Sequence, residues 1–123
     1  MTMKRVHLEL ARGHDFPEGS RERGYDFVAP LDDDGHLQAD EWRQERKRCR
    51  VRRFWVDEPD QIGLLVHKRG GAWVFDYNPG TEADDEAGFK FNKHQFVPGE
   101  YVSITEHDGE QHTFRIITVA DLR

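Results

Sequence analysis

The chain has a single cysteine, Cys49, among its 123 residues, so it cannot form an internal disulfide. No segment approaches the ~20 consecutive apolar residues that a membrane-spanning helix requires. The first residues, MTMKRVHLELAR, lack the unbroken apolar run of a secretory signal peptide. These absences suit a soluble cytoplasmic protein, and the length suits one domain with a single core, which we expect over residues 1–123.

An excess of positive charge is missing too. The 18 Lys and Arg residues are outnumbered by 24 Asp and Glu residues, which gives a formal net charge of -6. This balance disfavours bulk nucleic-acid binding, because long-range steering toward DNA needs a positive field. Hydrophobic residues make up only 36% of the chain, but three Trp, three Tyr and eight Phe compensate, since each aromatic ring buries a large apolar area. We therefore expect a thin aromatic core beneath a highly charged surface.

Motifs for catalysis or metal binding are also lacking. Ser20 and Ser103 have no nucleophile-elbow context, and no Gly-rich phosphate loop follows a predicted strand. The seven histidines include no pair four residues apart and no HxH motif. The DDDG stretch at 32–35 resembles part of a calcium loop, but Pro30 occupies the first ligand position. We therefore predict no catalytic residue, no metal and no cofactor.

What the sequence does contain is a period of two, which is typical of half-buried strands. The expected inward residues are Val6, Leu8 and Leu10 in a first strand and Tyr25, Phe27 and Ala29 in a second. Asp32–Gly35 is typical of a turn. Asp40 is then expected to cap a short helix that continues to about Arg48, with Trp42 facing inward.

Two hairpins are predicted further along. In QIGLLVHKRGGAWVFDYN, Gly70 and Gly71 fit a two-residue type I′ turn. The resulting register places Ile62, Leu64, Val66, Trp73, Phe75 and Tyr77 on one face. In EYVSITEHDGEQHTFRIITV, a three-residue loop with Gly109 in a left-handed conformation keeps Val102 opposite Phe114 and Ile104 opposite His112.

Residues 79–88, which include Asp84, Asp85 and Glu86, are predicted to form an exposed acidic loop, followed by a short strand at Phe89 and Phe91. The whole pattern predicts a mainly β protein of six to seven antiparallel strands with one short helix. A small barrel is the expected architecture and a sandwich is the alternative, because either arrangement relieves the open edges of a single sheet.

The most unusual stretch is RQERKRCRVRRFW at 43–55, with seven cations and one anion. A regular strand would bury Arg53, so we predict a bulge at Arg52 and Arg53. The inward residues are then Cys49, Val51, Phe54 and Val56, and the outward residues are Arg48, Arg50, Arg52 and Trp55. The buried thiol of Cys49 is expected to be inert.

The outward row has two interpretations. It suits phosphate contacts with Trp55 stacking on a base. It also suits ordinary cross-strand ion pairs with Glu100, Glu106, Glu110 or the acids of 82–86. The negative net charge favours the second interpretation, and nucleic acid is the less favoured partner.

From these patterns we expect a binding or protein-interaction module without catalysis. Its expected surface is Arg48, Arg50, Arg52 and Trp55, flanked by Arg43 and Arg46, and its expected partner is an anionic ligand or an acidic protein surface. The alternative is a metal-dependent or small-ligand-processing barrel enzyme with histidines in the lumen. That alternative needs at least three His or carboxylate side chains converging in an open cavity, whereas the module needs a filled interior.

Overall fold

The computed structural model describes residues 2–77, 86–88 and 90–122, and these residues form eight strands and two short helical segments. The strands are β1 (Thr2–Leu10), β2 (Ser20–Leu31), β3 (Arg50–Trp55), β4 (Glu58–His67), β5 (Trp73–Asp76), β6 (Glu86–Gly88), β7 (Tyr101–Thr105) and β8 (Gln111–Asp121). The α-helix α1 (Ala39–Glu45) and the 3-10 helix η1 (Arg46–Arg48) lie between β2 and β3.

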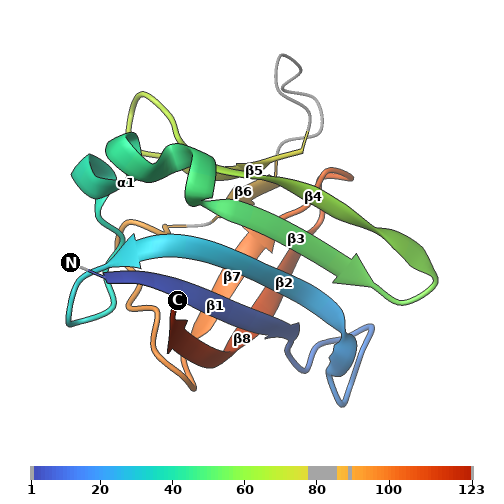
Figure 1. The fold of residues 1–123 in the computed structure, drawn as a ribbon. Helices are drawn as coiled ribbons and strands as arrows, with labels where there is room; N and C mark the ends of the chain where they lie inside the picture. The colour runs from blue at the N-terminus through green and yellow to red at the C-terminus, as the bar shows by residue number, and fades with distance from the viewer. Residues whose placement is uncertain (1, 78–85, 89, 123) are drawn as a thin grey trace.

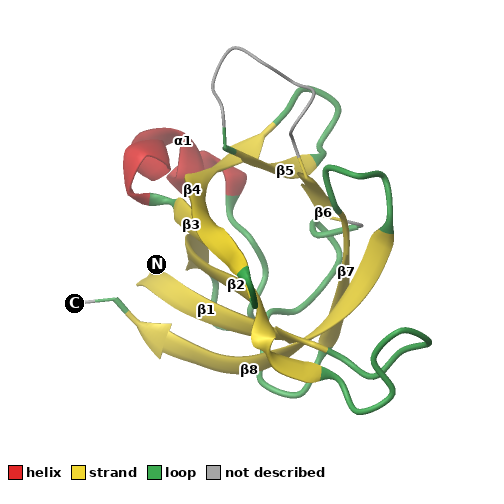
Figure 2. Cartoon of the chain, turned by 90° about the vertical axis from the view of Figure 1, so that its right-hand side faces the viewer, coloured by secondary structure: helices red, strands yellow, loops and turns green. Residues whose placement is uncertain are grey.

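Each strand pairs antiparallel with the next, and β8 pairs back with β1, so the sheet closes into a barrel (Figure 1). In Figure 2 the strands surround the interior, and α1 lies beside the ends of β3 and β4. The predicted antiparallel barrel is confirmed, with eight strands among the described residues instead of six or seven. The short strand expected at Phe89 and Phe91 is displaced: β6 lies just before it, Phe91 sits in a turn, and Phe89 lies outside the described residues.

Large side chains fill the interior. The predicted inward residues of β1 and β2 are all buried: Val6, Leu8, Leu10, Tyr25, Phe27 and Ala29. The Phe27 ring centroid lies 5.4 Å from that of Phe75 and 5.7 Å from that of Phe96. Phe91 packs edge-on against Phe96 at 5.1 Å. An interlocked aromatic cluster therefore compensates for the low hydrophobic content.

The helix α1 is anchored by Trp42, as predicted. This side chain is 5% exposed, and its Nε1 donates a hydrogen bond to the Leu65 carbonyl oxygen at 2.8 Å. The helix begins at Ala39 without a side-chain cap, so the predicted capping role of Asp40 was wrong. Asp40 instead pairs with Arg43. None of the helices in the described ranges has the length and apolar character needed to cross a membrane.

The C-terminal hairpin confirms the predicted three-residue loop. Val102 pairs with Phe114 and Ile104 with His112. Gly109 has a φ of 85°, the left-handed conformation that the bulged loop requires.

The β4–β5 hairpin is shifted by one residue from the prediction. Leu65 pairs with Phe75 and His67 with Trp73, because the loop contains three residues, Arg69–Gly71, instead of two. Leu65 is therefore fully buried, whereas Ile62 is 52% exposed. The slip leaves a large aliphatic side chain on the outer surface, next to the basic strand β3.

Candidate binding site

Along the basic strand β3, the side chains alternate between the inner and outer faces of the sheet without interruption. It pairs with β2 in an unbroken register from Val51 opposite Phe27 to Trp55 opposite Arg23. The register shift lies on the β4 side, between the partners of Arg53 and Trp55. The predicted bulge at Arg52 and Arg53 was therefore wrong, and Arg53 is buried at 4% exposure.

Cys49 and Val51 are buried as predicted, at 0% and 1% exposure. Burial raises the pKa of the Cys49 thiol to about 11, and the nearby Glu45 carboxylate adds to this shift. A thiol that stays protonated and enclosed is a weak nucleophile. This agrees with the expected inert cysteine.

Trp55 was predicted to face outward, and this was also wrong. It is half-buried on the same side of β3 as Arg53, whose guanidinium carbon lies 4.3 Å from the Trp55 ring centroid. Phe54 takes the outer position instead of the predicted inner one, and its ring stacks on His7 at 5.5 Å. Trp55 is therefore not part of the exposed row that was predicted to contain it together with Arg48, Arg50 and Arg52.

The three predicted arginines of that row, Arg48, Arg50 and Arg52, are exposed and line a shallow groove of about 850 Å³. We call it the outer groove. It runs over the outer faces of β1 to β4, beside η1 and the C-terminal segment. Its lining residues are Arg5, Asp26, Phe27, Val28, Lys47, Arg48, Arg50, Val51, Arg52, Ile62 and Leu122. Five cations therefore surround one carboxylate, and the predicted flanking residues Arg43 and Arg46 lie outside this lining.

Two of these cations are already paired. Arg52 donates to Asp26 and, through Nη1, to Asp60 at 3.0 Å. The bonds to Asp26, followed by those to Asp60, raise the pKa of Arg52 despite some desolvation. Arg48 Nη1 lies 3.1 Å from Glu45 Oε2. The cross-strand ion-pair interpretation thus holds for Arg52, although its partners differ from the predicted acids, whereas Arg48 pairs with a residue three positions earlier in the chain, at the end of α1.

The other three cations of the groove have no ion partner in the part of the chain that the structure describes. Within the described ranges, Arg5, Lys47 and Arg50 make no ion pair and no side-chain hydrogen bond. They come from β1, η1 and β3, and Arg5 and Arg50 flank Val28 of β2 on the outer surface. The groove therefore presents free positive charge around an apolar floor.

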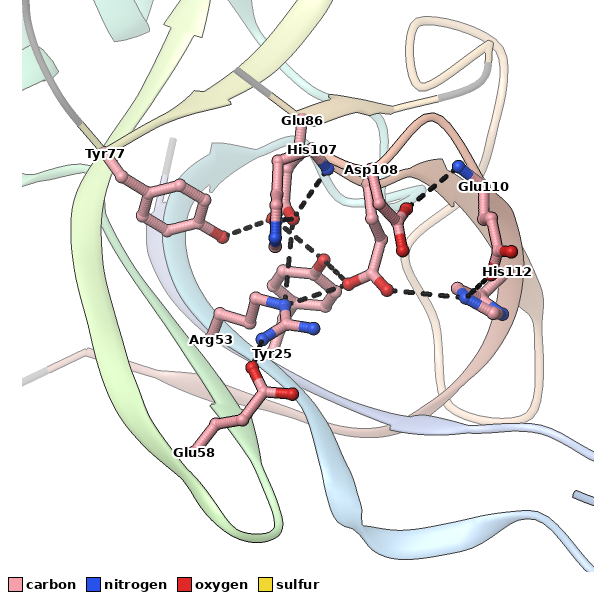
Figure 3. A network of polar contacts seen from close by, with 10 residues as sticks. Tyr25, Arg53, Glu58, Tyr77, Glu86, His107, Asp108, Glu110 and His112 are labelled. Carbon is pink, nitrogen blue, oxygen red and sulfur yellow. Dashed lines mark hydrogen bonds and ion pairs between the residues drawn. The ribbon is translucent and has the colours of Figure 1, made fainter. Parts of the chain in front are cut away.

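A second cluster of charge lies inside the barrel (Figure 3). Glu86 and Glu106 are 0% and 4% exposed, so the prediction of Glu86 as part of an exposed acidic loop was wrong. Arg53 Nε donates to Glu106 Oε2 at 2.9 Å and lies 3.7 Å from Glu86 Oε2, while its Nη1 reaches Glu58 at 3.2 Å. Burial opposes the charged guanidinium, but the bond to Glu106 outweighs it, so the pKa of Arg53 is raised.

Two tyrosines complete this inner network. The Tyr25 hydroxyl lies 2.6 Å from Glu106 Oε2 and 2.9 Å from Glu86 Oε1, and Tyr77 donates to Glu86 Oε1 at 2.7 Å. Desolvation and the adjacent carboxylates raise the pKa of both tyrosines far above its ordinary value, so both hydroxyls keep their protons. A hydroxyl has one proton, so Tyr25 donates to one of the two carboxylates at a time.

Two histidines connect the network to the surface. His107 Nδ1 lies 3.0 Å from Glu86 Oε2, and His112 Nε2 lies 3.5 Å from Glu106 Oε1. The network thereby joins side chains from β2, β3, β6 and the β7–β8 hairpin. The sequence signal for it was the position of Arg53 on the inward face of a regular strand, but the carboxylates that compensate it lie far along the chain.

The predicted turn at Asp32–Gly35 is present. Asp32 Oδ1 accepts hydrogen bonds from the backbone N–H groups of Asp34 and His36, both at 2.9 Å. The bond from His36, followed by the one from Asp34, lowers the pKa of Asp32. In the described residues, Asp32, Asp34 and His36 place one possible ligand atom each within 4.8 Å of one another, but their hydrogen bonds are those of an ordinary capped turn.

Comparison with protein-family models, with curated proteins and with solved structures finds no match to this chain. Function is therefore inferred from two features of this molecule, the outer groove and the inner network.

Proposed function

We propose that this protein is a binding module without catalytic activity, which holds an anionic partner in the outer groove. The observation that supports this most is the charge imbalance of the groove, whose described lining holds five cations and the carboxylate of Asp26, with two of the five cations already in ion pairs. Arg5, Lys47 and Arg50 have no ion partner in the described part of the chain. An anion can contact these three residues without breaking an existing ion pair.

The charge distribution also favours a defined orientation of the partner. The stretch 43–55 carries seven cations and one anion, whereas the whole chain has a net charge of -6. An acidic partner is repelled by most of the surface and attracted at the groove, and such electrostatic complementarity contributes more to specificity than to raw affinity.

The alternative of a barrel enzyme has one observation in its favour, because Glu86, Glu106, His107 and His112 converge in the inner network. The two carboxylates, however, are 0% and 4% exposed and are already engaged by Arg53 and Tyr25. A substrate could reach them only if these contacts opened. We therefore do not propose catalysis.

The proposal is tested by measuring binding of a fluorescent heparin hexasaccharide at 50 and 200 mM salt. We expect binding at the lower salt concentration and a loss of about tenfold or more at the higher one, because contacts between cations and a polyanion release counterions. Arg50→Glu should weaken binding at least tenfold. The matched control is Arg21→Glu, which makes the same charge change at an exposed residue of β2 outside the groove, and it should alter binding less than twofold.

Two results would overturn the proposal. One is the absence of heparin binding at 50 mM salt. The other is an equal loss of binding in the two charge-reversal variants, because this would mean that only the total charge matters.

A further inference from the structure

We infer that the partner in the outer groove is an extended segment of another protein, which presents several carboxylates together with an aliphatic side chain. This inference rests on the proposed function of the groove and names the class of its partner. Three properties of the groove carry it: its apolar floor, the spacing of its cations and the nature of its aromatic residues.

The first property is the apolar floor. Ile62 is 52% exposed and lies among the cations, and Val28 and Leu122 also line the groove. Ile62 is directly paired with Arg52 on the neighbouring strand. A ligand made only of phosphate or sulfate groups gains nothing from covering Ile62, whereas a ligand with an aliphatic side chain removes that apolar surface from water.

The second property is the spacing of the cations. Arg50 and Arg52 are alternate residues of β3, so their side chains leave the outer face about 6.6 to 6.8 Å apart along the strand. Arg5 lies two strands away, across β2, which places it about 10 Å to the side. Cations distributed in this way suit several separate carboxylates better than a single anionic headgroup. Alternate residues of an extended peptide repeat at the same spacing as Arg50 and Arg52, and guanidinium groups match carboxylates in bidentate geometry.

The third property is the lack of an available aromatic face. Among the described residues, the one aromatic that lines the groove is Phe27, and its side chain is 1% exposed within the core. On the outer face of β3, the Phe54 ring is covered by Arg52, whose guanidinium carbon lies 5.0 Å from the ring centroid, and by the stacked His7. Single-stranded nucleic acid relies on stacking platforms, so a peptide is favoured over it.

The experiment uses three labelled heptapeptides in fluorescence anisotropy. The first is Glu-Ser-Glu-Ser-Leu-Ser-Glu, in which the acidic residues and the leucine share one face of an extended chain. In the second, serine replaces the leucine, and in the third, lysines replace the glutamates. We expect the first peptide to bind at least fivefold more tightly than the second, and the third not to bind.

Two variants assign the effect to the groove. Ile62→Ser should remove the difference between the first two peptides, because it removes the exposed aliphatic contact while leaving the cations in place. Arg50→Glu should weaken both acidic peptides, and Arg21→Glu should change neither by more than twofold.

The heparin measurement separates this inference from the proposed function. If heparin binds but the leucine peptide shows no advantage, the partner class is wrong and the anion groove remains. Tighter binding of an octathymidylate or of vesicles rich in anionic lipid than of the leucine peptide would likewise overturn the partner class. If heparin does not bind, the proposed function fails, and the inference fails with it because it rests on that function.

Discussion

At the scale of single residues, His7 couples its charge to the structure of the outer surface through two carboxylates. Its Nδ1 lies 2.5 Å from Asp26 Oδ1, and its Nε2 lies 3.0 Å from Glu9 Oε2. Partial burial of the ring opposes the charged form, but the hydrogen bonds to Asp26 and Glu9 outweigh it and raise the pKa of His7 above its ordinary value. Asp26 also binds Arg52, so His7 belongs to the border of the outer groove.

This raised pKa predicts a pH dependence of stability. A raised folded-state pKa means that the charged His7 stabilises the fold, fully so below its unfolded pKa of about 6.5. That contribution is lost as the pH rises through the higher folded-state pKa. We therefore expect the free energy of unfolding, measured with urea between pH 6 and pH 9, to decrease with pH in the wild type and to decrease less in His7→Gln.

The matched control is His14→Gln, because His14 is an exposed loop residue. This variant should keep the wild-type pH dependence. The assignment to His7 would be wrong if His7→Gln retained the full decrease.

Prediction from the sequence succeeded for residues whose inward or outward orientation is set by the local alternation of apolar and polar residues. Val6, Tyr25 and Phe27 follow from alternation alone, because one face of a strand must be buried. It failed at Arg53, because burying a guanidinium is unfavourable unless buried carboxylates compensate it. Glu86 and Glu106 supply that compensation, but local sequence does not indicate that they face the same interior.

At the scale of elements, the two hairpins show why the predicted strand register was right for β7–β8 and wrong by one residue for β4–β5. Both have the same three-residue loop, with Glu106 N–H bonded to the Glu110 carbonyl at 2.8 Å and Lys68 N–H bonded to the Ala72 carbonyl at 2.8 Å. In the C-terminal hairpin, a two-residue loop would have paired apolar residues of one strand with polar residues of the other. The apolar pattern therefore selected the right register. In β4 the apolar residues are consecutive at 64–66, so either face of the strand satisfied the pattern.

The loop geometry predicts a specific effect of glycine substitution. Gly109 has a φ of 85°, and a Cβ there would meet no atom within 4 Å, so the cost of Gly109→Ala is purely conformational. We expect the free energy of unfolding to decrease by about 1–2 kcal/mol. In Gly13→Ala, which also has open space but no positive φ, it should change by less than ~0.5 kcal/mol. Equal effects in chemical denaturation would contradict the left-handed loop.

The inner network predicts an asymmetry between its buried and exposed partners. Arg53→Met leaves Glu86 and Glu106 buried without their cation, which should lower the free energy of unfolding by about 3–5 kcal/mol. Glu58→Gln removes only the 51% exposed partner of Arg53 and should cost ~1 kcal/mol or less. Adding Glu106→Gln to Arg53→Met should recover part of the loss. If Arg53→Met and Glu58→Gln unfolded at the same urea concentration, the buried ion pairs of Arg53 would contribute no more to stability than its exposed one.

At the scale of the whole molecule, large buried side chains from the strands and from Phe91 and Phe96 pack together inside the barrel. This predicts a contrast between two phenylalanines on opposite faces of the sheet. Phe27→Ala removes a ring that is 1% exposed and packs against Phe75, Phe91 and Phe96, so it should cost about 3–5 kcal/mol. Phe54→Ala removes an outer ring that stacks on His7 and should cost roughly 0.5–1.5 kcal/mol. Similar costs in thermal and urea unfolding would indicate a loosely packed lumen.

The candidate site was predictable only in part at this scale. The exposure of Arg48, Arg50 and Arg52 followed from the sequence, because a dense run of arginines on a strand must place most of them in water. The contribution of Arg5 did not follow because it depends on β2 pairing with both β1 and β3, and that of Leu122 because it depends on closure from β8 to β1. Lys47 of η1, just before β3, was not predicted either.

Closure of the sheet from β8 back to β1 has one more consequence. Every strand in the described ranges has a neighbouring strand on both sides, so the described sheet has no edge strand for an incoming chain to extend, although some ladders are short and β4 pairs with β5 only from Leu64 to His67. Recognition is therefore left to the outward side chains, which can be exchanged without changing any pairing between strands. The scaffold and its binding preference are physically separable, so the same barrel can be redirected to a new partner by substitutions on its outer face alone.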